Sequence, residues 1–300
     1  MKIIISFAFV ALCFFSSAAA QPCLDAAKVV PPTMSEETRK VYLTKLAEAE
    51  KVHLDKPNDA DSIIWLGRRT AYLGEYKNAI RIFSSGIVLH PNDARLYRHR
   101  GHRYITIRCF DDAIKDFEKA AALVKGKPDE VEPDGLPNAK NIPTSTLQSN
   151  IWYHIGLAYY LKGDLSNAIR AYEECQKVSK NNDMRVATTY WHYMTLRRAG
   201  KKKDAEKMLK SFNTNLELIE NTDYLKLLKL NKGEVKAEYL LATIRGDANT
   251  LGSASLGYGI GNYFLYNGDR EKAIATFRKI LQGDQWASFG YIAAETDLAR

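Results

Sequence analysis

Two histidines have the spacing that could place a metal ion on one helix face. His99 and His102 lie three positions apart, so both rings could reach a single ion. A metal site needs a third and often a fourth ligand, and none lies nearby in the sequence. Arginines crowd the same segment and disfavour a bound cation. The sequence therefore predicts no metal site and no cofactor.

The other patterns that resemble catalytic motifs are incomplete. The segment Gly257–Gly261 imitates a phosphate-binding loop, but it lacks the last glycine of G-x-G-x-x-G and follows no strand. His154 and His192 sit beside tryptophans on apolar segments, where we expect buried, hydrogen-bonded rings. A catalytic serine, a cysteine–histidine pair or a carboxylate dyad would need partners that the sequence does not supply. We predict that the protein is not an enzyme.

Helices must position these residues, because the chain repeats one helical pattern at a fixed interval. Gly67 and Gly101 are 34 residues apart, as are Ala79 and Ala113. The first copy is marked by Leu66, Gly67, Ala79, Phe83 and Pro91, the second by Gly101, Tyr104, Ala113, Phe117 and Ala120, and the third by Trp152, Ile155, Gly156, Tyr159, Ala168 and Tyr172. Small residues at these places let the two helices of a hairpin approach closely.

This pattern resembles the tetratricopeptide repeat, whose signature is W-x2-L-G-x2-Y, then A-x3-F, then P on a 34-residue period. The resemblance implies an all-α fold, a right-handed α-solenoid of helix-turn-helix repeats that stack to bury their apolar faces. We expect a signal peptide at 1–20, a linker at 21–33 and the solenoid at 34–300. Its parts are repeats near 60–93, 94–125, 149–182, 186–215 and 254–285, a proline-rich insertion at 126–148, divergent helices at 216–250 and a closing helix at 286–300.

The start of the chain is typical of a secretory signal peptide. Lys2 precedes an apolar run at 3–15 and a stretch of small residues that ends at Ala20. A retained anchor is the alternative, but the run is shorter than the roughly 20 apolar residues that a membrane span needs. Lipid attachment at Cys23 fits poorly with the residues that precede it. We expect a free, secreted or periplasmic protein with no membrane span after cleavage.

Three cysteines remain after the expected cleavage, namely Cys23, Cys109 and Cys175. An oxidising compartment permits disulfides, but an odd number leaves one thiol unpaired. Cys109 and Cys175 fall in different repeats and are not expected to bridge each other. Cys175 takes a small core position, and whether Cys23 is paired or lipidated stays open.

The insertion at 126–148 interrupts the repeats with prolines and acidic residues that cannot continue a helix. One interpretation is a solvated linker between two subarrays. The other is a flap across the groove of the solenoid, with Leu136 and Ile142 as its docking points.

The resemblance also implies that the first helix of each hairpin lines a concave groove. Tyrosine and arginine dominate the positions concerned, and these side chains suit peptide or glycan contacts. Ordinary packing between repeats is the alternative explanation for the tyrosines. The candidate partner-binding residues are Arg68, Tyr72, Arg95, Arg98, His102, Tyr153, Tyr160, Tyr190, Arg197, Arg198, Tyr258, Asn262 and Tyr266.

These features predict an exported, non-catalytic scaffold or adaptor that binds a protein or peptide in its groove. The net charge of +8, or +7 once Lys2 is removed, favours acidic or carboxylate-bearing partners. Nucleic acid is not expected as a partner. A glycan- or small-ligand-binding protein of the cell envelope and an enzyme on a repeat scaffold are the alternatives. A groove floor of stacking tyrosines with few charges would favour the first alternative. A closed pocket beneath the flap, with His102 or His154 beside a carboxylate, would favour the second.

Overall fold

The computed structural model describes residues 22–244 and 251–300. The expected signal peptide at 1–20 and the last part of the divergent segment, 245–250, lie outside these residues. Throughout the part described, regular structure is helical apart from a single antiparallel bridge between Val131 and Thr146. The all-α solenoid fold is thus confirmed. None of the described helices is both long and apolar enough to cross a membrane.

Helical hairpins follow one another along the chain after two leading helices. The leading helices are α1 (Pro22–Ala26) and α2 (Glu36–Asp55). The hairpins are α3 (Ala60–Tyr72) with α4 (Tyr76–Leu89), α5 (Ala94–Thr106) with α6 (Phe110–Val124), α7 (Leu147–Lys162) with α8 (Leu165–Val178), α9 (Asn182–Arg198) with α10 (Lys202–Ser211), and α13 (Leu251–Tyr266) with α14 (Arg270–Leu281). Between the last two lies a divergent pair, α11 (Thr222–Asn231) and α12 (Ala237–Ile244), whose helices both pack on α13 rather than on each other. The last helix is α15 (Phe289–Leu298).

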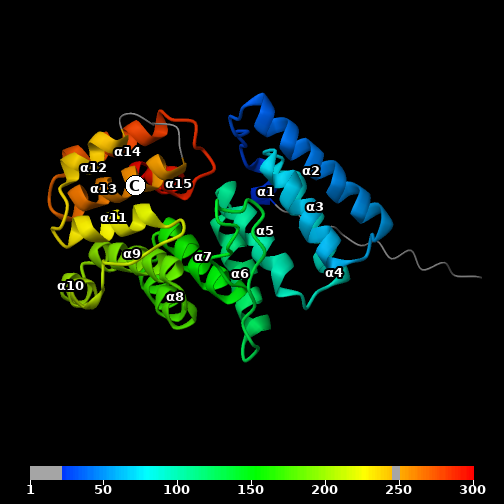
Figure 1. Ribbon diagram of the computed structural model, residues 1–300, viewed down its shortest axis with the longest axis horizontal. Helices are drawn as coiled ribbons and strands as arrows, with labels where there is room; N and C mark the ends of the chain where they lie inside the picture. The colour runs from blue at the N-terminus through cyan, green and yellow to red at the C-terminus, as the bar shows by residue number, and fades with distance from the viewer. Residues whose placement is uncertain (1–21, 245–250) are drawn as a thin grey trace, which may run out of the picture.

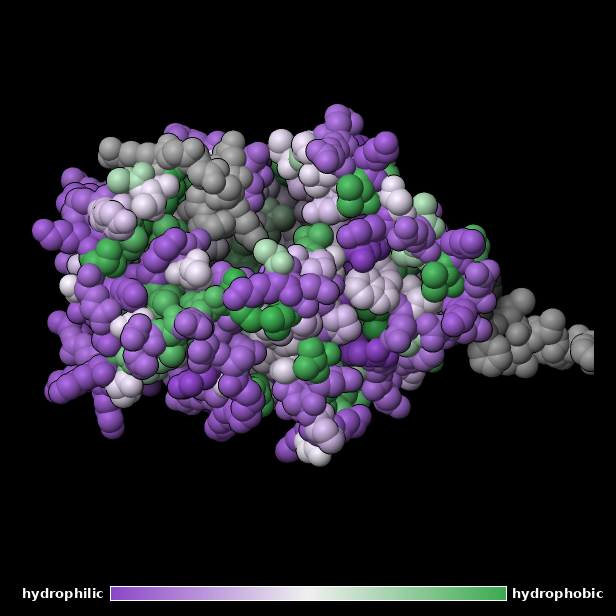
Figure 2. All heavy atoms as spheres, viewed as in Figure 1, coloured by the Kyte–Doolittle hydropathy of each residue, from purple (hydrophilic) through white to green (hydrophobic). Residues whose placement is uncertain are grey.

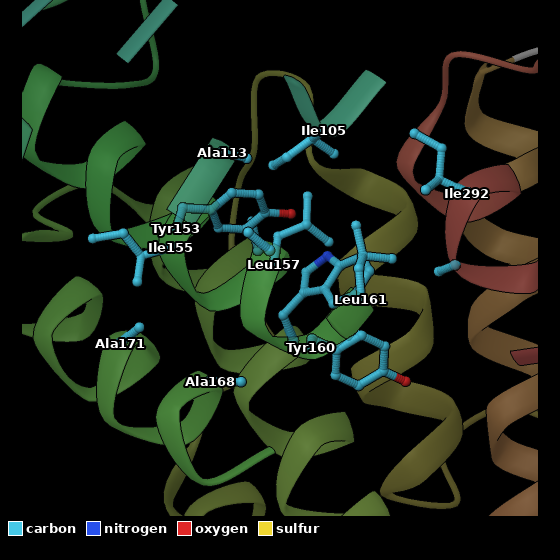
Figure 3. Packing of buried hydrophobic residues seen from close by; sticks show 14 of the residues in the cluster. Ile105, Ala113, Tyr153, Ile155, Leu157, Tyr160, Leu161, Ala168, Ala171 and Ile292 are labelled. Carbon is cyan, nitrogen blue, oxygen red and sulfur yellow. The ribbon is translucent and has the colours of Figure 1, made fainter. Parts of the chain in front are cut away.

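Each well-formed hairpin is held by an aromatic ring that touches the backbone of the opposite helix. A Cβ atom added to Gly67 would lie 2.4 Å from the ring of Phe83, and one added to Gly156 would lie 2.6 Å from Tyr172. No side chain fits there, so the glycine permits the close approach expected from the sequence. Figure 3 shows the result around α7, where buried side chains of α5, α7, α8 and α15 pack together.

The hairpins follow an arc, and the end of the chain folds back into it (Figure 1). The N-terminal helices form one arm, α6 to α8 the bend and α11 to α14 the other arm. Helix α15 packs on α13 and α14 and also contacts α7. The closing helix expected from the sequence therefore turns toward the inside of the arc. The face of the arc seen in Figure 2 is mostly hydrophilic, with hydrophobic side chains in small separate groups.

One hairpin turn departs from the glycine pattern and receives this returning segment. The turns carry glycine at positive φ, for example Gly74 (φ 89°) and Gly163 (φ 89°), but the turn between α5 and α6 carries Arg108 (φ 66°). The guanidinium of Arg108 lies 3.8 Å from the ring centre of Trp286 and donates to Glu295 Oε2 at 2.7 Å. The strained backbone at Arg108 thus coincides with a contact between the two arms.

The insertion folds as a flap against the inner side of the first two hairpins. Its base is closed by the bridge between Val131 and Thr146, and Glu132 is buried. Arg69 donates to the carbonyl of Gly135 at 2.8 Å, although these residues are 66 positions apart. The expected docking points were wrong: Leu136 and Ile142 are 52% and 48% exposed. Polar contacts hold the flap instead, because Glu132 forms an ion pair with Arg98 inside the arc.

A disulfide joins the N-terminal segment to the second repeat. Cys23 in α1 bonds to Cys109, the residue after Arg108, with Cα atoms 5.8 Å apart. Cys175 is the unpaired cysteine of the described residues and is buried, as its core position indicates. Burial raises the pKa of its thiol to about 11, which keeps it unreactive.

We predict that this disulfide contributes measurably to stability. It closes a loop across a separation of 86 residues, for which the chain-entropy model gives about 4.6 kcal/mol. Urea denaturation of the wild type should shift to lower urea when reductant is added, whereas a Cys23→Ser/Cys109→Ser double variant should not respond. Peptide mapping without reductant should recover the two cysteines in one linked fragment. Free alkylation of Cys23 in the native protein would contradict the pairing.

Candidate functional site

A pocket of about 360 Å³ lies inside the arc, where the first helices of successive hairpins converge. The first helices contribute His102 from α5, Asn150, Tyr153 and His154 from α7, Met184 and Ala187 from α9, Tyr224 from α11 and Ser255 from α13. The flap supplies Thr144 and Ser145, the loop before α11 supplies Glu220 and Asn221, and the returning segment supplies Ala287, Ser288 and Phe289. We call this the concave pocket. The flap and the returning segment bound it together with the inner helices.

Two neutral histidines form part of its wall. The rings of His102 and His154 lie 4.8 Å apart, and Phe289 contacts both, at 5.3 and 5.4 Å. Burial, with smaller contributions from nearby arginines, lowers the pKa of His154 to about 3 and that of His102 well below its usual value. Nδ1 of His154 lies 2.6 Å from the carbonyl oxygen of Asn150 and must donate to it. Nε2 is then an acceptor in a neutral ring.

Tyrosines and one carboxylate complete the pocket. Tyr153 donates to the hydroxyl of Tyr224 at 3.4 Å, and burial raises the pKa of Tyr153 well above its usual value. Glu220 is exposed at the rim, where Thr144 donates to it. Among the described lining residues, Glu220 is the one with a charged side chain at neutral pH. The pocket is therefore aromatic inside and weakly acidic at its edge.

Four of the candidate residues form a buried polar cluster behind the pocket. Arg198 donates to Asp297 at 2.8 and 2.9 Å and to Asn262 Oδ1 at 2.9 Å. Tyr258 donates to Asp297 at 2.7 Å, and the hydroxyls of Tyr160 and Tyr258 are 2.7 Å apart. The carboxylate and the tyrosines hold the pKa of Arg198 above its ordinary value. This cluster fixes α15 against α7, α9 and α13.

Two of the candidate partner-binding arginines, Arg98 and Arg197, form their contacts within the protein. Arg98 is 8% exposed and pairs with Glu132 of the flap at 2.9 Å. Arg197 donates to the hydroxyl of Tyr193 at 2.9 Å and to the carbonyl of Tyr266 at 2.9 Å. The terminal guanidinium nitrogens of Arg98 and Arg197 thus have partners within the protein, whereas Nε of Arg98 is buried without one. The flap and the late helices supply these acceptors, which repeat spacing alone does not reveal.

The other candidate residues are dispersed. Arg95 pairs with Asp61 and Asp93 at the entrance between α3 and α5. Tyr190 is fully buried and stacks on Tyr224, with ring centres 5.6 Å apart. The remaining three are half-buried: Arg68 lies over the ring of Trp65, Tyr72 contacts Tyr42, and Tyr266 donates to Asn231 at 2.7 Å. Packing between helices thus accounts for Tyr160, Tyr190 and Tyr258, and of the thirteen residues two, His102 and Tyr153, line the concave pocket.

Several pocket residues escaped the sequence analysis. Tyr224 and Glu220 belong to the segment that does not phase cleanly with the repeats, and Phe289 lies in the tail. His154 was expected to be buried and hydrogen-bonded, and it is. The same expectation was wrong in part for His192, which is buried but has no hydrogen-bond partner at either ring nitrogen. Phe289 lies outside the repeats, so the repeat pattern could not identify it. Tyr224 lies in the first turn of α11, and the amphipathic pattern of that helix could have identified it.

Comparison with known proteins identifies the repeat within the chain. Residues 149–182 match the tetratricopeptide repeat family model, and these are the residues expected for the third repeat. No curated protein matches the sequence. The repeat architecture rests on this match and on the phased hairpins described above.

Three solved structures illustrate the proteins that the chain is similar to. YrrB, described as a TPR protein with an unusual peptide-binding site, shares 15% identity over 83% of this chain and 97% of its own, with a TM-score of 0.43. PilW, a type IV pilus biogenesis factor, shares 14% over 82% and 87%, with a TM-score of 0.47. MamA shares 18% over 68% and 99%, with a TM-score of 0.45.

Removal of the carboxylate in the buried cluster should destabilise the fold. We expect Asp297→Ala to cost about 3 kcal/mol of unfolding free energy, because it leaves Arg198 desolvated without its partner. The matched control is Asp111→Ala, which breaks an exposed ion pair with Lys162 and should change the unfolding free energy far less, because solvent screens exposed pairs. Urea denaturation of both variants checks this, and equal effects would contradict the importance of the cluster.

Acid should weaken the fold through buried histidines, and His192 isolates one contribution. Neither ring nitrogen of His192 has a hydrogen-bond partner, and burial lowers its pKa to about 4. In the unfolded chain the pKa of this histidine is about 6.5. Below that pH the unfolded chain binds a proton at His192 and the folded chain does not, so the free energy of unfolding falls as the pH drops from about 6.5 toward 4. Between pH 7 and pH 5 the wild type should lose about 2 kcal/mol more than His192→Phe. Denaturation curves at both pH values test this, and parallel losses would exclude His192 as a source.

Proposed function

We propose that this tetratricopeptide-repeat protein is an exported, non-catalytic scaffold that binds a protein or peptide partner inside its arc. The concave pocket carries the proposal, because it is lined by the inner helices α5, α7, α9, α11 and α13 together with the flap and the returning segment. Its volume is near the lower end of the range for binding sites, about 300–1,000 Å³. A pocket of this size accommodates one large side chain of a bound segment.

Export is supported by the disulfide as well as by the N-terminal sequence. Cys23 follows the expected cleavage site closely, and it pairs with Cys109 rather than carrying an exposed thiol. Such bonds persist in oxidising compartments and are rare in the cytosol. A secreted or periplasmic location therefore fits both the signal pattern and the covalent structure.

The chemistry of the pocket favours binding over catalysis. His102 and His154 lie beneath the end of the flap, as an enzyme on this scaffold would require. Their rings contact aromatic groups and a backbone carbonyl, and in the part of the chain described neither donates to a carboxylate. A histidine whose pKa lies near 3 is a poor proton acceptor at neutral pH. The arrangement supplies shape and hydrogen-bond acceptors rather than a general base.

A second candidate is a neutral small ligand or glycan. The floor of the pocket presents Tyr153, Tyr224 and Phe289 with a single charged group at the rim. Flat aromatic faces with few charges suit sugar rings as well as peptide side chains. The two candidates differ in size, because a peptide must extend beyond the pocket along the arc.

Partner capture with a filled pocket tests the proposal. The tagged protein would be crosslinked in its native compartment as wild type, as Ala287→Trp, which places an indole in the pocket, and as Ser85→Trp on the exposed back of α4. We expect a discrete protein in the wild-type and Ser85→Trp captures that is at least about tenfold depleted with Ala287→Trp.

The pattern of loss separates the candidates. A partner list that Ala287→Trp leaves unchanged would contradict the concave pocket as the binding site. An empty list, together with a saccharide that raises the thermal midpoint of the wild type and not of Ala287→Trp, would favour the second candidate.

A further inference from the structure

A second and larger groove lies on a different face of α7 from the concave pocket. It has a volume of about 850 Å³ and is lined by α6, α7 and α8. Helix α7 presents Tyr153 and His154 to the concave pocket and Trp152, Ile155 and Tyr159 to this groove. Figure 3 shows the side chains of Tyr153 and Ile155 pointing to opposite sides. We call this the outer groove, and it shares no lining residue with the concave pocket.

In the preceding repeat, the equivalent place is filled by an arginine. Tyr97 and Tyr104 of α5 are buried, and the guanidinium of Arg100 lies 5.8 Å from the centre of each ring. Arg100 donates to both carboxylate oxygens of Asp116 on α6 at 2.7 Å, and to the hydroxyl of Ser84 on α4 at 2.9 Å. One guanidinium thus covers two aromatic rings, neutralises a buried carboxylate and links α4, α5 and α6.

The third repeat keeps the two aromatic rings and lacks the arginine. Gly156 stands 55 positions after Gly101, its counterpart in the second repeat. At the same offset, the two tyrosines, the arginine and the aspartate of the second repeat are replaced, in that order, by Trp152, Tyr159, Ile155 and Ala171. All four replacements line the outer groove. An ion pair that fills one groove is therefore exchanged for two apolar side chains in the next, and the space is open.

Two aromatic rings and a carboxylate are consequently left without a cation. Trp152 and Tyr159 are half-buried, whereas the rings at the same positions of the second repeat are 9% and 4% exposed. Within residues 22–244 and 251–300, no arginine or lysine lies over either ring. Glu118 stands 34 positions after Ser84 and accepts a hydrogen bond from the hydroxyl of Tyr159. In the part of the chain that the structure describes, no basic side chain pairs with Glu118.

The basic side chains of the outer groove lie at its rim and do not fill the space. Lys177 pairs with Glu174 at 2.6 Å, and Arg170 donates to the side chain of Asn167. Lys125, Arg170 and Lys177 are all exposed, so solvent and salt screen their charges. The floor of the groove therefore offers aromatic faces and one carboxylate to a group from outside.

We propose that the outer groove binds an arginine side chain of a protein partner, in the place that Arg100 fills in the second repeat. Trp152 and Tyr159 supply ring faces for a cation, and Glu118 supplies the acceptor oxygens. A guanidinium suits this set better than an ammonium group, because its planar fork stacks on rings and pairs with a carboxylate together. This second docking surface does not depend on the proposed function, because the two sites share no residue.

Peptide selection with matched variants tests the outer groove. A displayed random peptide library would be selected on the wild type and on four variants. Ile155→Arg/Ala171→Asp rebuilds the arginine–aspartate pair of the second repeat inside the groove, and Glu118→Gln removes its carboxylate. Glu50→Gln, on the exposed side of α2, is the matched control, and Ala287→Trp fills the concave pocket.

We expect one class of selected peptides with arginine enriched at a single position. Glu50→Gln and Ala287→Trp should bind these peptides as the wild type does. Glu118→Gln and the double variant should bind them about tenfold more weakly or worse. In synthetic copies, citrulline at the enriched position should cause a similar loss, because it keeps the shape of arginine without the charge. Lysine there should recover part of the affinity.

The remaining outcomes separate the two sites. If the double variant does not fold, Ala122→Trp fills the groove from an exposed position of α6, and Ala47→Trp on α2 is its control. Selected peptides without arginine enrichment would overturn the proposal, as would arginine peptides that the groove variants bind unchanged, or a selection that yields no peptide. Peptides lost only with Ala287→Trp report on the concave pocket, so the outer groove can fail while the proposed function stands.

Discussion

The contact between a glycine backbone on one helix and an aromatic ring on its partner underlies the whole architecture. Where Gly67 meets Phe83, or Gly156 meets Tyr172, the helices lie too close for any side chain at the glycine. This closeness fixes the geometry of each hairpin, and stacked hairpins then present their first helices on one side. The concave pocket is a consequence, because its histidines and tyrosines sit on helices whose orientation those contacts determine.

Two segments outside the repeats convert an open inner surface into a bounded site. The flap brings Thr144 and Ser145 to the rim, and the returning segment brings Phe289 against His102 and His154. Both are held by buried charges rather than by apolar contact alone: Glu132 on Arg98, and Asp297 on Arg198. Removing one partner of a buried ion pair lowers the free energy of unfolding by more than the intact pair adds to it, because the other charge is left buried alone. Arrangements of the flap and the returning segment that separate these pairs are therefore disfavoured.

The hairpins could be predicted from sequence because their determinants are local. A 34-residue period and a glycine–alanine–aromatic pattern recur within each unit, and helix type follows from spacing alone. The pairing of the groove residues could not be predicted in this way. Arg198 meets Asp297, 99 positions away, and Arg108 meets Glu295, 187 positions away. The repeat pattern predicts which positions face the inside of the arc. The residue that each of these side chains contacts depends on how closely the two arms approach each other, which the local pattern does not determine.

The turn between α5 and α6 fastens both arms of the molecule at neighbouring residues. Cys109 is bonded covalently to the N-terminal segment, while Arg108 stacks on Trp286 and forms an ion pair with Glu295 in the returning segment. An ordinary solenoid under tension can peel apart one repeat at a time from a free end. Here a pulling force applied to the two ends would converge on one turn in the second repeat. The contacts at this turn should therefore bear a stretching force first, and they should break together in one step rather than yielding gradually repeat by repeat.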